Sequence, residues 1–133
     1  MLAVIDCGTT NTRIYVTDKA GRTICSGDKK VGVRDTSIHK TTAVLREGVT
    51  DLYYSILSKN GIREDEIEYV IASGMITSEI GLKEIPHLVA PVGVDELARG
   101  VVKVENDPDV LPIQRPIYFV RGIRNHYEEN ARA

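Results

Sequence analysis

The stretch Ile5-Asp6-Cys7-Gly8-Thr9-Thr10-Asn11-Thr12-Arg13 determines how the amino-terminal part of this chain folds. Its first residue, Ile5, ends a continuously apolar run at residues 2–5, which is typical of a central strand covered on both faces. It leads into a segment in which Ile14 and Val16 alternate with more polar side chains, as in a half-buried strand. The pattern therefore predicts a β-hairpin with an aspartate just before its tight turn.

The residue types in this turn suit a phosphate group. Gly8 lets the backbone turn and lets another group approach closely, while Thr9, Thr10 and Asn11 offer hydroxyl, amide and main-chain donors. Asp6 is expected at the carboxyl end of its strand, where α/β sheets place ligands, and it can hold Mg²⁺ directly or through water. The alternative is an ordinary hairpin turn whose free amides are capped by the aspartate.

Length and composition limit the class of protein. A chain of 133 residues with 42% hydrophobic content can bury one substantial core, so a single domain is expected. A net charge of −2 gives no general field for nucleic acid or an anionic membrane. No apolar run approaches the roughly 20 residues of a membrane span, and no signal-type segment begins the chain. We expect a cytoplasmic protein that binds neither nucleic acid nor membrane.

The cysteines and histidines form no recognisable metal or redox pattern. Cys7 and Cys25 have neither zinc-ligand nor redox spacing. If the first three strands form a meander with the second in the middle, the strands that carry Cys7 and Cys25 lie two spacings, or about 9.6 Å, apart. A disulfide needs Cα atoms within about 7 Å. We expect two free thiols, with Cys7 as a small packed side chain. His39, His87 and His126 are expected at the surface or in ordinary polar contacts.

The next elements are a third strand and a long helix. A turn signal at residues 18–21 precedes a strand at 22–26, which returns beside the second strand. Asp35 or Ser37 can cap the helix, and Asn60-Gly61 stops it, while Gly48 weakens it. The apolar face of the helix comprises Val44, Leu45, Val49, Leu52, Tyr53, Ile56 and Leu57.

A second strand-to-turn junction follows the helix. An apolar strand at residues 67–72 ends in Ser73-Gly74-Met75, and a helical turn at 76–80 is closed by Gly81. We then expect a short strand at 87–90, a helix at 94–102, a connector at 106–116 and a strand at 117–120. Residues 123–133 are polar and charged, and they are predicted to exit from the domain formed by residues 1–122.

Together, the order of elements and the motifs resemble the N-terminal half of the 2-dehydro-3-deoxygalactonokinase family, within the actin-like, hexokinase-like superfamily of sugar kinases. The resemblance spans nearly the whole chain. The motifs are the stretch at 5–13, Gly32-Val33, Ala72-Ser73-Gly74-Met75-Ile76-Thr77-Ser78, Gly81-Leu82-Lys83-Glu84-Ile85-Pro86, Pro91 and the strand at 117–122.

This resemblance implies an α/β fold: a ribonuclease-H-like, actin-like ATPase lobe with a mixed five-stranded sheet of order 3-2-1-4-5 and helices. It implies ATP and Mg²⁺ as cofactors and transfer of the terminal phosphate to the 6-hydroxyl of 2-dehydro-3-deoxy-D-galactonate. The implied partners are the sugar acid, ATP and a C-terminal lobe that is missing here. A homodimer is possible as well.

The resemblance also assigns roles to residues. It gives Asp6 to the metal and to catalysis, and it places Ser73, Gly74, Met75 and Thr77 on the substrate side. Phosphoryl transfer is mainly positioning and charge stabilisation, so Arg13 and Lys83 are candidates to meet the substrate carboxylate or the developing charge. The residues implied for the nucleotide phosphates are Gly8, Thr9, Thr10 and Asn11.

Plainer roles remain open for several of these residues. Arg13 can instead pair with a carboxylate across the sheet, and Lys83 can be simply solvated. The Ser73-Gly74-Met75 segment can be a strand-ending turn with a core methionine. The sequence places no general base near the acceptor hydroxyl.

The chain also departs from the family pattern. Cys7 stands where the family tends to have tryptophan, and Arg121-Gly122 stands where it tends to have Pro-Gly. The later Arg-Gly-Glu-Glu segment, a second Gly-rich phosphate loop and an adenosine site are missing, so we expect the isolated chain to be inactive. A sugar kinase with another acceptor and a non-catalytic binding or assembly module are the competing interpretations.

Overall fold

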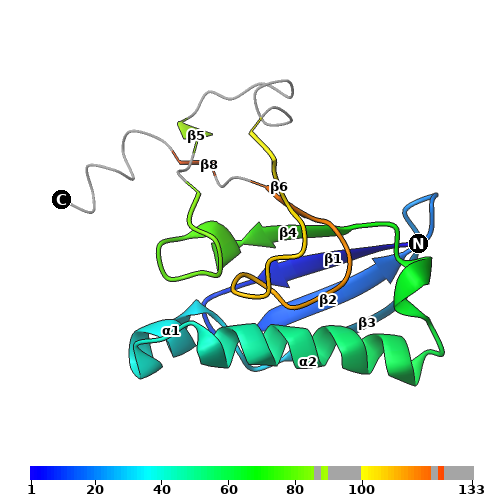
Figure 1. The fold of residues 1–133 in the computed structure, drawn as a ribbon, viewed down its shortest axis with the longest axis horizontal. Coiled ribbons are helices and arrows are strands. Elements are labelled where there is room, and N and C mark those ends of the chain that lie inside the picture. The colour runs from blue at the N-terminus through cyan, green and yellow to red at the C-terminus, as the bar shows by residue number, and fades with distance from the viewer. Residues whose placement is uncertain (86–87, 90–99, 121–122, 125–133) are drawn as a thin grey trace.

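Three antiparallel strands open the chain: β1 (Leu2–Cys7), β2 (Thr12–Thr17) and β3 (Thr23–Lys29). The computed structural model describes residues 1–85, 88–89, 100–120 and 123–124 (Figure 1). β2 pairs with β1 on one side and with β3 on the other. This confirms the predicted meander and hairpin, although β3 extends past residue 26, where we expected it to end. Within the described residues both cysteines are free, as expected.

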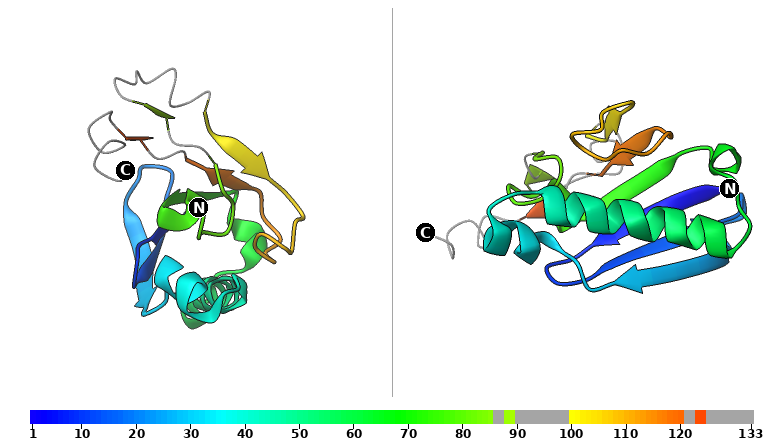
Figure 2. Two further views of the ribbon diagram at one scale, coloured as in Figure 1. Left: turned by 90° about the vertical axis from the view of Figure 1, so that its left-hand side faces the viewer. Right: turned by 60° about the horizontal axis from the view of Figure 1, so that its bottom comes forward.

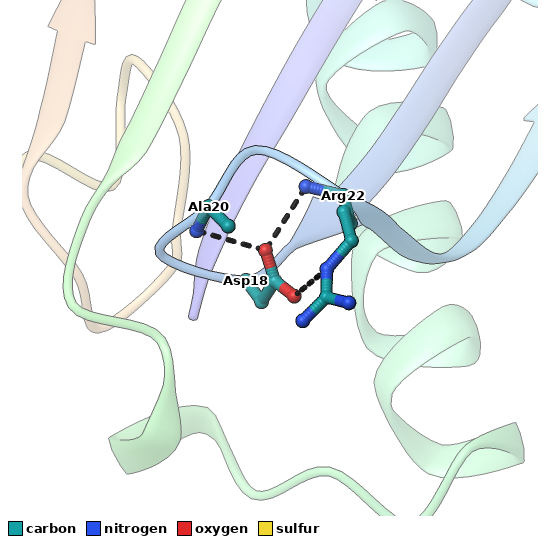
Figure 3. Close-up of polar contacts among 3 residues, drawn as sticks. All are labelled: Asp18, Ala20 and Arg22. Atoms are coloured by element: carbon teal, nitrogen blue, oxygen red, sulfur yellow. Dashed lines mark hydrogen bonds and ion pairs between the residues drawn. The ribbon is translucent and has the colours of Figure 1, made fainter.

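The turn between β2 and β3 is built around Asp18 (Figure 3). Its carboxylate accepts hydrogen bonds at 2.9 Å from the backbone amides of Ala20 and Arg22 and from Nε of Arg22. The hydrogen bond from the Arg22 amide is the main cause that lowers the pKa of Asp18. Gly21 has φ +83°, which the turn requires and which favours glycine. The turn signal at residues 18–21 is therefore confirmed.

β1 also pairs in parallel with β4 (Val70–Gly74), which pairs in parallel with β7 (Ile117–Phe119). β6 (Val102–Val104) adds an antiparallel edge strand, so the sheet has six strands in the order β3-β2-β1-β4-β7-β6. Its first five strands follow the expected order, and β6 is the addition. Our prediction of a helix reaching Val102 was wrong at that end, because Val102 pairs with Phe119 in the sheet.

Two helices follow β3 where one was expected: α1 (Val33–His39) and α2 (Ala43–Lys59). They are separated at Lys40, whose φ of 56° lies in the left-handed region and ends α1. The predicted caps at Asp35 and Ser37 were therefore wrong, since α1 begins after Gly32. α2 ends at Lys59, directly before Asn60 and Gly61, as predicted, and it lies along one face of the sheet (Figure 2).

α2 covers one face of the sheet, and the opposite face is more open. Ala3, Ile5 and Cys7 of β1 are fully buried with the apolar side of α2. On the other face of β1, Val4 is half-buried and Asp6 is exposed. The expectation that β1 is covered on both faces therefore does not hold among the described residues. The open face is the one that carries Asp6, Arg13 and Asp28.

A second, two-stranded sheet joins β5 (Leu88–Val89) to β8 (Ile123–Arg124). The predicted strand at 87–90 thus contributes to this pair rather than to the main sheet. Two 3-10 turns, η1 (Glu64–Glu66) and η2 (Met75–Thr77), flank β4. His87, Pro91, most of the predicted helix at 94–102, Arg121, Gly122 and residues 125–133 lie outside the described residues. In the described part, no helix is long and apolar enough to cross a membrane.

Candidate active site

Asp6 lies near the carboxyl end of β1, in a row of polar residues that crosses four strands. The strand registers place it directly opposite Arg13 on β2 and beside Ser73 on β4. Arg13 is in turn opposite Asp28 on β3. Because directly opposed residues share a face of the sheet, the four side chains lie on the open face, away from α2.

Asp6, Arg13 and Asp28 of this row border a hollow of about 370 Å³, which we call the Asp6 hollow, whereas Ser73 does not line it. Asp6, Gly8, Asn11 and Arg13, all predicted site residues, contribute to its wall. Thr9 and Thr10 belong to the same turn but do not line the hollow. The full lining is Asp6, Gly8, Asn11, Thr12, Arg13, Tyr15 and Asp28.

Sequence reasoning missed Thr12, Tyr15 and Asp28 as lining residues. Asp28 reaches the hollow because β3 continues to Lys29, and the predicted strand stopped at residue 26. Tyr15 was read only as a polar position in β2, yet it shares a face with Arg13 two residues earlier. The register shift between Val16 and Thr17 sets Asp28 opposite Arg13, and a regular register continued from the Asp18 turn would have set Gly27 there instead.

The turn at residues 8–11 is held from two sides. Its own closure is a hydrogen bond of 2.8 Å from the Gly8 amide to the Asn11 carbonyl. The first amides of α1 then donate to it, from Val33 to the Gly8 carbonyl at 3.2 Å and from Arg34 to the Thr9 carbonyl at 2.9 Å. These helix amides are therefore committed to the protein. The amides of Thr9 and Thr10 have no backbone partner among the described residues, so they can donate to a ligand.

Gly32 explains why the Gly32-Val33 motif accompanies the turn. A β-carbon at Gly32 would overlap the carbonyl groups of Thr9 and Gly8, so only glycine lets α1 begin this close to the turn. Buried Thr12 supports the same junction, because its hydroxyl donates to the carbonyl of Val31 at 2.7 Å. The turn is consequently pre-shaped by contacts that do not involve a ligand.

The second strand-to-turn junction lies against the first. Gly74 has φ +85°, and a β-carbon there would overlap the Cys7 carbonyl and lie 3.1 Å from Oδ1 of Asp6. Glycine is thus required by backbone conformation and by close approach. The contact brings the turn of Ser73 and Met75 beside the metal candidate. The side chain of Met75 is 37% exposed, which does not fit a core methionine.

The loop that follows η2 folds back on itself. The amides of Leu82 and Lys83 donate to the Ile76 carbonyl at 3.0 and 3.3 Å, and Ile85 donates to the Thr77 carbonyl at 3.0 Å. Thr77 is fully buried, and its hydroxyl has no hydrogen-bond partner among the described residues. Lys83, in this loop, is half-buried. Neither Thr77 nor Lys83 lines the Asp6 hollow.

Arg13 is the positive group of the Asp6 hollow. Tyr15, which shares the face of β2 with Arg13, is the largest cause that raises the pKa of Arg13, and the charges of Asp28 and Asp6 add to it. Two carboxylates and one guanidinium leave the hollow with a formal charge of −1. Such a hollow suits a phosphate that arrives with a metal cation better than a bare anion.

Cys7 is not available for chemistry. Burial is the main cause that raises the pKa of its thiol, which disfavours the reactive thiolate. The side chain is fully buried and its Sγ lies 3.7 Å from the Gly8 carbonyl oxygen. This agrees with the predicted role as a small packed residue.

The chemistry of the hollow fits Mg²⁺. Asp6 offers an exposed, hard oxygen ligand, and the missing side chain of Gly74 leaves room beside it. Among the described residues, no cluster of three or more acidic, cysteine or histidine side chains could hold a metal by itself. Mg²⁺ commonly binds through one or two carboxylates together with waters and substrate phosphates, so a single aspartate is sufficient here.

Comparison with known proteins supports a kinase fold. The family model described as 2-keto-3-deoxy-galactonokinase matches residues 6–131. The crystal structure of a protein from Sinorhizobium meliloti, assigned as a 2-dehydro-3-deoxygalactonokinase, superposes with a TM-score of 0.65 at 17% identity. That match covers 95% of this chain but only 36% of the Sinorhizobium chain.

A second solved structure is more distant. The activator of the 2-hydroxyisocaproyl-CoA dehydratase from Clostridium difficile, with bound ADPNP, gives a TM-score of 0.42 at 18% identity. The match covers 55% of this chain and 23% of that one. No curated protein sequence matches the chain.

Proposed function

Since the chain belongs to the 2-keto-3-deoxy-galactonokinase family, we propose that it forms the first lobe of an ATP-dependent sugar-acid kinase. The acceptor is the 6-hydroxyl of 2-dehydro-3-deoxy-D-galactonate, and a second lobe completes the cleft. The observation that carries this proposal is the Asp6 hollow, in which an exposed carboxylate, a tight glycine turn and an arginine share one end of the sheet.

Each part of the Asp6 hollow has a role in phosphoryl transfer. Asp6 would hold Mg²⁺, which neutralises charge on the phosphates when it is bound. Gly8 and Asn11 line the hollow, while Thr9 and Thr10 offer main-chain amides at the outer edge of the same turn. These groups bind and orient the terminal phosphates of ATP.

Arg13 then meets the charge that develops on the transferred group, because a guanidinium donates in a fixed fork to phosphate oxygens. Its position opposite Asp6 sets it on the same face as the metal candidate. Stabilisation by such fixed donors needs no rearrangement during the reaction.

The substrate side is the turn that follows β4. Ser73, Gly74 and Met75 pass beside Asp6, so an acceptor bound along this turn would approach the metal-held phosphate. Thr77 supports the turn from within the core, and Lys83 supplies a cation for the sugar-acid carboxylate.

The test is a coupled ADP-release assay on the complete protein that contains this chain, with 2-dehydro-3-deoxy-D-galactonate and a panel of other hydroxylated acids as acceptors. Asp6→Asn removes a charge with little change in shape. It should lower kcat at least about 100-fold, because metal-ion charge stabilisation is worth several kcal/mol.

Asp51→Asn is the matched control, since Asp51 is an exposed aspartate on α2, and it should leave kcat unchanged. Near wild-type turnover of the Asp6→Asn variant at saturating Mg²⁺ would refute the metal role. Turnover with a different acceptor alone would keep the kinase and replace its substrate. No turnover with any acceptor would favour a non-catalytic module.

A further inference from the structure

A second hollow borders the turn at residues 8–11, on the side where α1 begins. It has a volume of about 240 Å³, and we call it the basic hollow. It shares no lining residue with the Asp6 hollow, yet Asn11 lines the one and Thr10 lines the other. The Cα atoms of successive residues are only about 3.8 Å apart, so one peptide unit of the turn borders both hollows. The full lining of the basic hollow is Thr10, Lys30, Arg34, Asp35 and Ile38.

The two hollows carry opposite charge. Lys30 and Arg34 supply two positive charges and Asp35 one negative charge, which gives the basic hollow a formal charge of +1. The Asp35 carboxylate already accepts a hydrogen bond of 2.9 Å from the Gly32 amide. Among the described residues, no carboxylate oxygen lies within 4.0 Å of the Lys30 ammonium or the Arg34 guanidinium. Both cations are therefore available to an anion.

Backbone hydrogen bonds fix the residues that carry these cations relative to the turn. The Arg34 amide donates to the Thr9 carbonyl at 2.9 Å. Val31, which follows Lys30, is hydrogen-bonded through its amide at 2.8 Å and through its carbonyl at 2.7 Å. The first amides of α1 are thus used within the protein, so the basic hollow depends on side chains rather than on the end of the helix. On the turn itself, the Thr10 amide has no partner among the described residues and can donate to a ligand.

We propose that the basic hollow binds a nucleotide phosphate that is not transferred, through the side chains of Lys30 and Arg34 and the main-chain amide of Thr10. This rests on the proposed function, in which the Asp6 hollow holds the terminal phosphate together with Mg²⁺. Neighbouring phosphates of a nucleotide share a bridging oxygen, so a chain of them can pass the turn from one hollow to the other. Lysine and arginine give charge-assisted hydrogen bonds to phosphate oxygens without a metal.

The place of the basic hollow in the sheet favours a phosphate over the carboxylate of the sugar acid. Lys30 directly follows β3, which is separated from β4 by β2 and β1 in the sheet order. In the proposed function the acceptor lies along the turn after β4. The acceptor and the basic hollow are then on opposite sides of the Asp6 turn, and the phosphate chain is the substrate group that reaches the β3 side.

Magnesium tripolyphosphate is the probe, because it carries a chain of phosphates without the base and ribose. NMR titration of the 133-residue chain should shift the Thr10 amide, the Nε–H signal of Arg34 and the CεH₂ signals of Lys30. The side-chain signals are the readout because both cations bind through the ends of their side chains. Titration with 2-dehydro-3-deoxy-D-galactonate alone should leave these side-chain signals unchanged.

Matched variants test whether the contacts are specific. Lys30→Met and Arg34→Gln should each weaken tripolyphosphate binding about threefold, a modest effect because ion pairs of exposed side chains are weak. Lys29→Met is the control, since Lys29 is an exposed neighbour that lines neither hollow, and it should weaken binding less than about twofold. In the complete protein, Arg34→Gln should raise KM for ATP about threefold and leave KM for the sugar acid unchanged.

Several results would overturn the proposal. Equal weakening by Lys29→Met and Lys30→Met would show that only overall charge matters. Side-chain shifts with the sugar acid but not with tripolyphosphate would assign the basic hollow to a carboxylate.

The same titration separates this proposal from the proposed function. Tripolyphosphate shifts at Asp6 and Gly8 without any at Lys30 and Arg34 would refute the role of the basic hollow and leave the proposed function standing. Shifts at Lys30 and Arg34 alone would support an anion site there and refute the role of the Asp6 hollow. No shift at either hollow would refute both.

Discussion

Gly74 lies directly against Asp6: a β-carbon on Gly74 would be 3.1 Å from Oδ1 of the aspartate and would overlap the Cys7 carbonyl. The contact joins the carboxyl ends of β1 and β4, where the registers pair Cys7 with Gly74 and Asp6 with Ser73. The metal candidate and the substrate-side turn therefore depend on each other for their positions.

Gly74→Ala should destabilise the fold by about 3 kcal/mol, since the positive φ costs about 1–2 kcal/mol and the overlap adds to it. The control is Gly61→Ala, which has φ +63° with nothing within 4 Å of its β-carbon, and which should lose only the conformational cost. Urea unfolding of both variants measures the difference. Equal losses would show that the approach of Gly74 to Cys7 and Asp6 carries no energy.

Lys83→Met in the complete protein should raise KM for the sugar acid about 10-fold or more and leave KM for ATP nearly unchanged. A charge-assisted hydrogen bond is worth about 1.5–3 kcal/mol, and the lysine follows the substrate-side turn. Lys59→Met, at the exposed end of α2, serves as the matched control. A change confined to KM for ATP would place the loop on the wrong side of the cleft.

Tyr54 should make the fold sensitive to alkali. Its hydroxyl donates to Oε1 of Glu64 at 2.9 Å, and burial, followed by this bond, raises the pKa of Tyr54 to about 12 from the ordinary tyrosine value of 10.0. The folded state therefore favours the protonated phenol. Its stabilisation is complete below pH 10 and is lost as the pH rises from 10 toward 12.

Urea midpoints measured between about pH 9 and pH 11.5 test this linkage. The midpoint should fall less steeply for Tyr54→Phe than for the unaltered chain. A residual slope should remain, because burial also raises the pKa of Tyr53. Tyr69→Phe, which removes a phenol with no hydrogen bond among the described residues, is the control. Identical slopes for all three proteins would contradict the assignment to Tyr54.

Local patterns predicted the elements that local chemistry controls. The hairpin at residues 5–13 and the end of α2 at Asn60-Gly61 follow from alternation and from glycine, so the sequence was sufficient. The break at Lys40 was not predictable in this way, because lysine has no preference for the left-handed conformation that it adopts there. Val102 was misassigned because its strand is defined by pairing with distant Phe119.

In the candidate site too, residues adjacent in sequence were predictable, and those brought together by strand pairing were not. Asp6 and the turn of Gly8 and Asn11 are adjacent in sequence, and the structure brings them together in one hollow. Asp28 comes from a neighbouring strand, and its place depends on a register that the sequence pattern did not reveal. The contact of Gly74 with Asp6 likewise depends on the parallel pairing of β1 with β4, which joins segments far apart in the chain.

The central claim is that the Asp6 turn binds a metal-bound phosphate, and an NMR titration of the 133-residue chain with Mg-ATP tests it most directly. We predict weak, roughly millimolar binding, because in the proposed two-lobe kinase the other lobe would supply the remaining contacts to the nucleotide. The amide shifts should be confined to residues 6–13 and 73–75, and Asp6→Asn should abolish them. Shifts that arise elsewhere, or that persist unchanged in Asp6→Asn, would contradict the account.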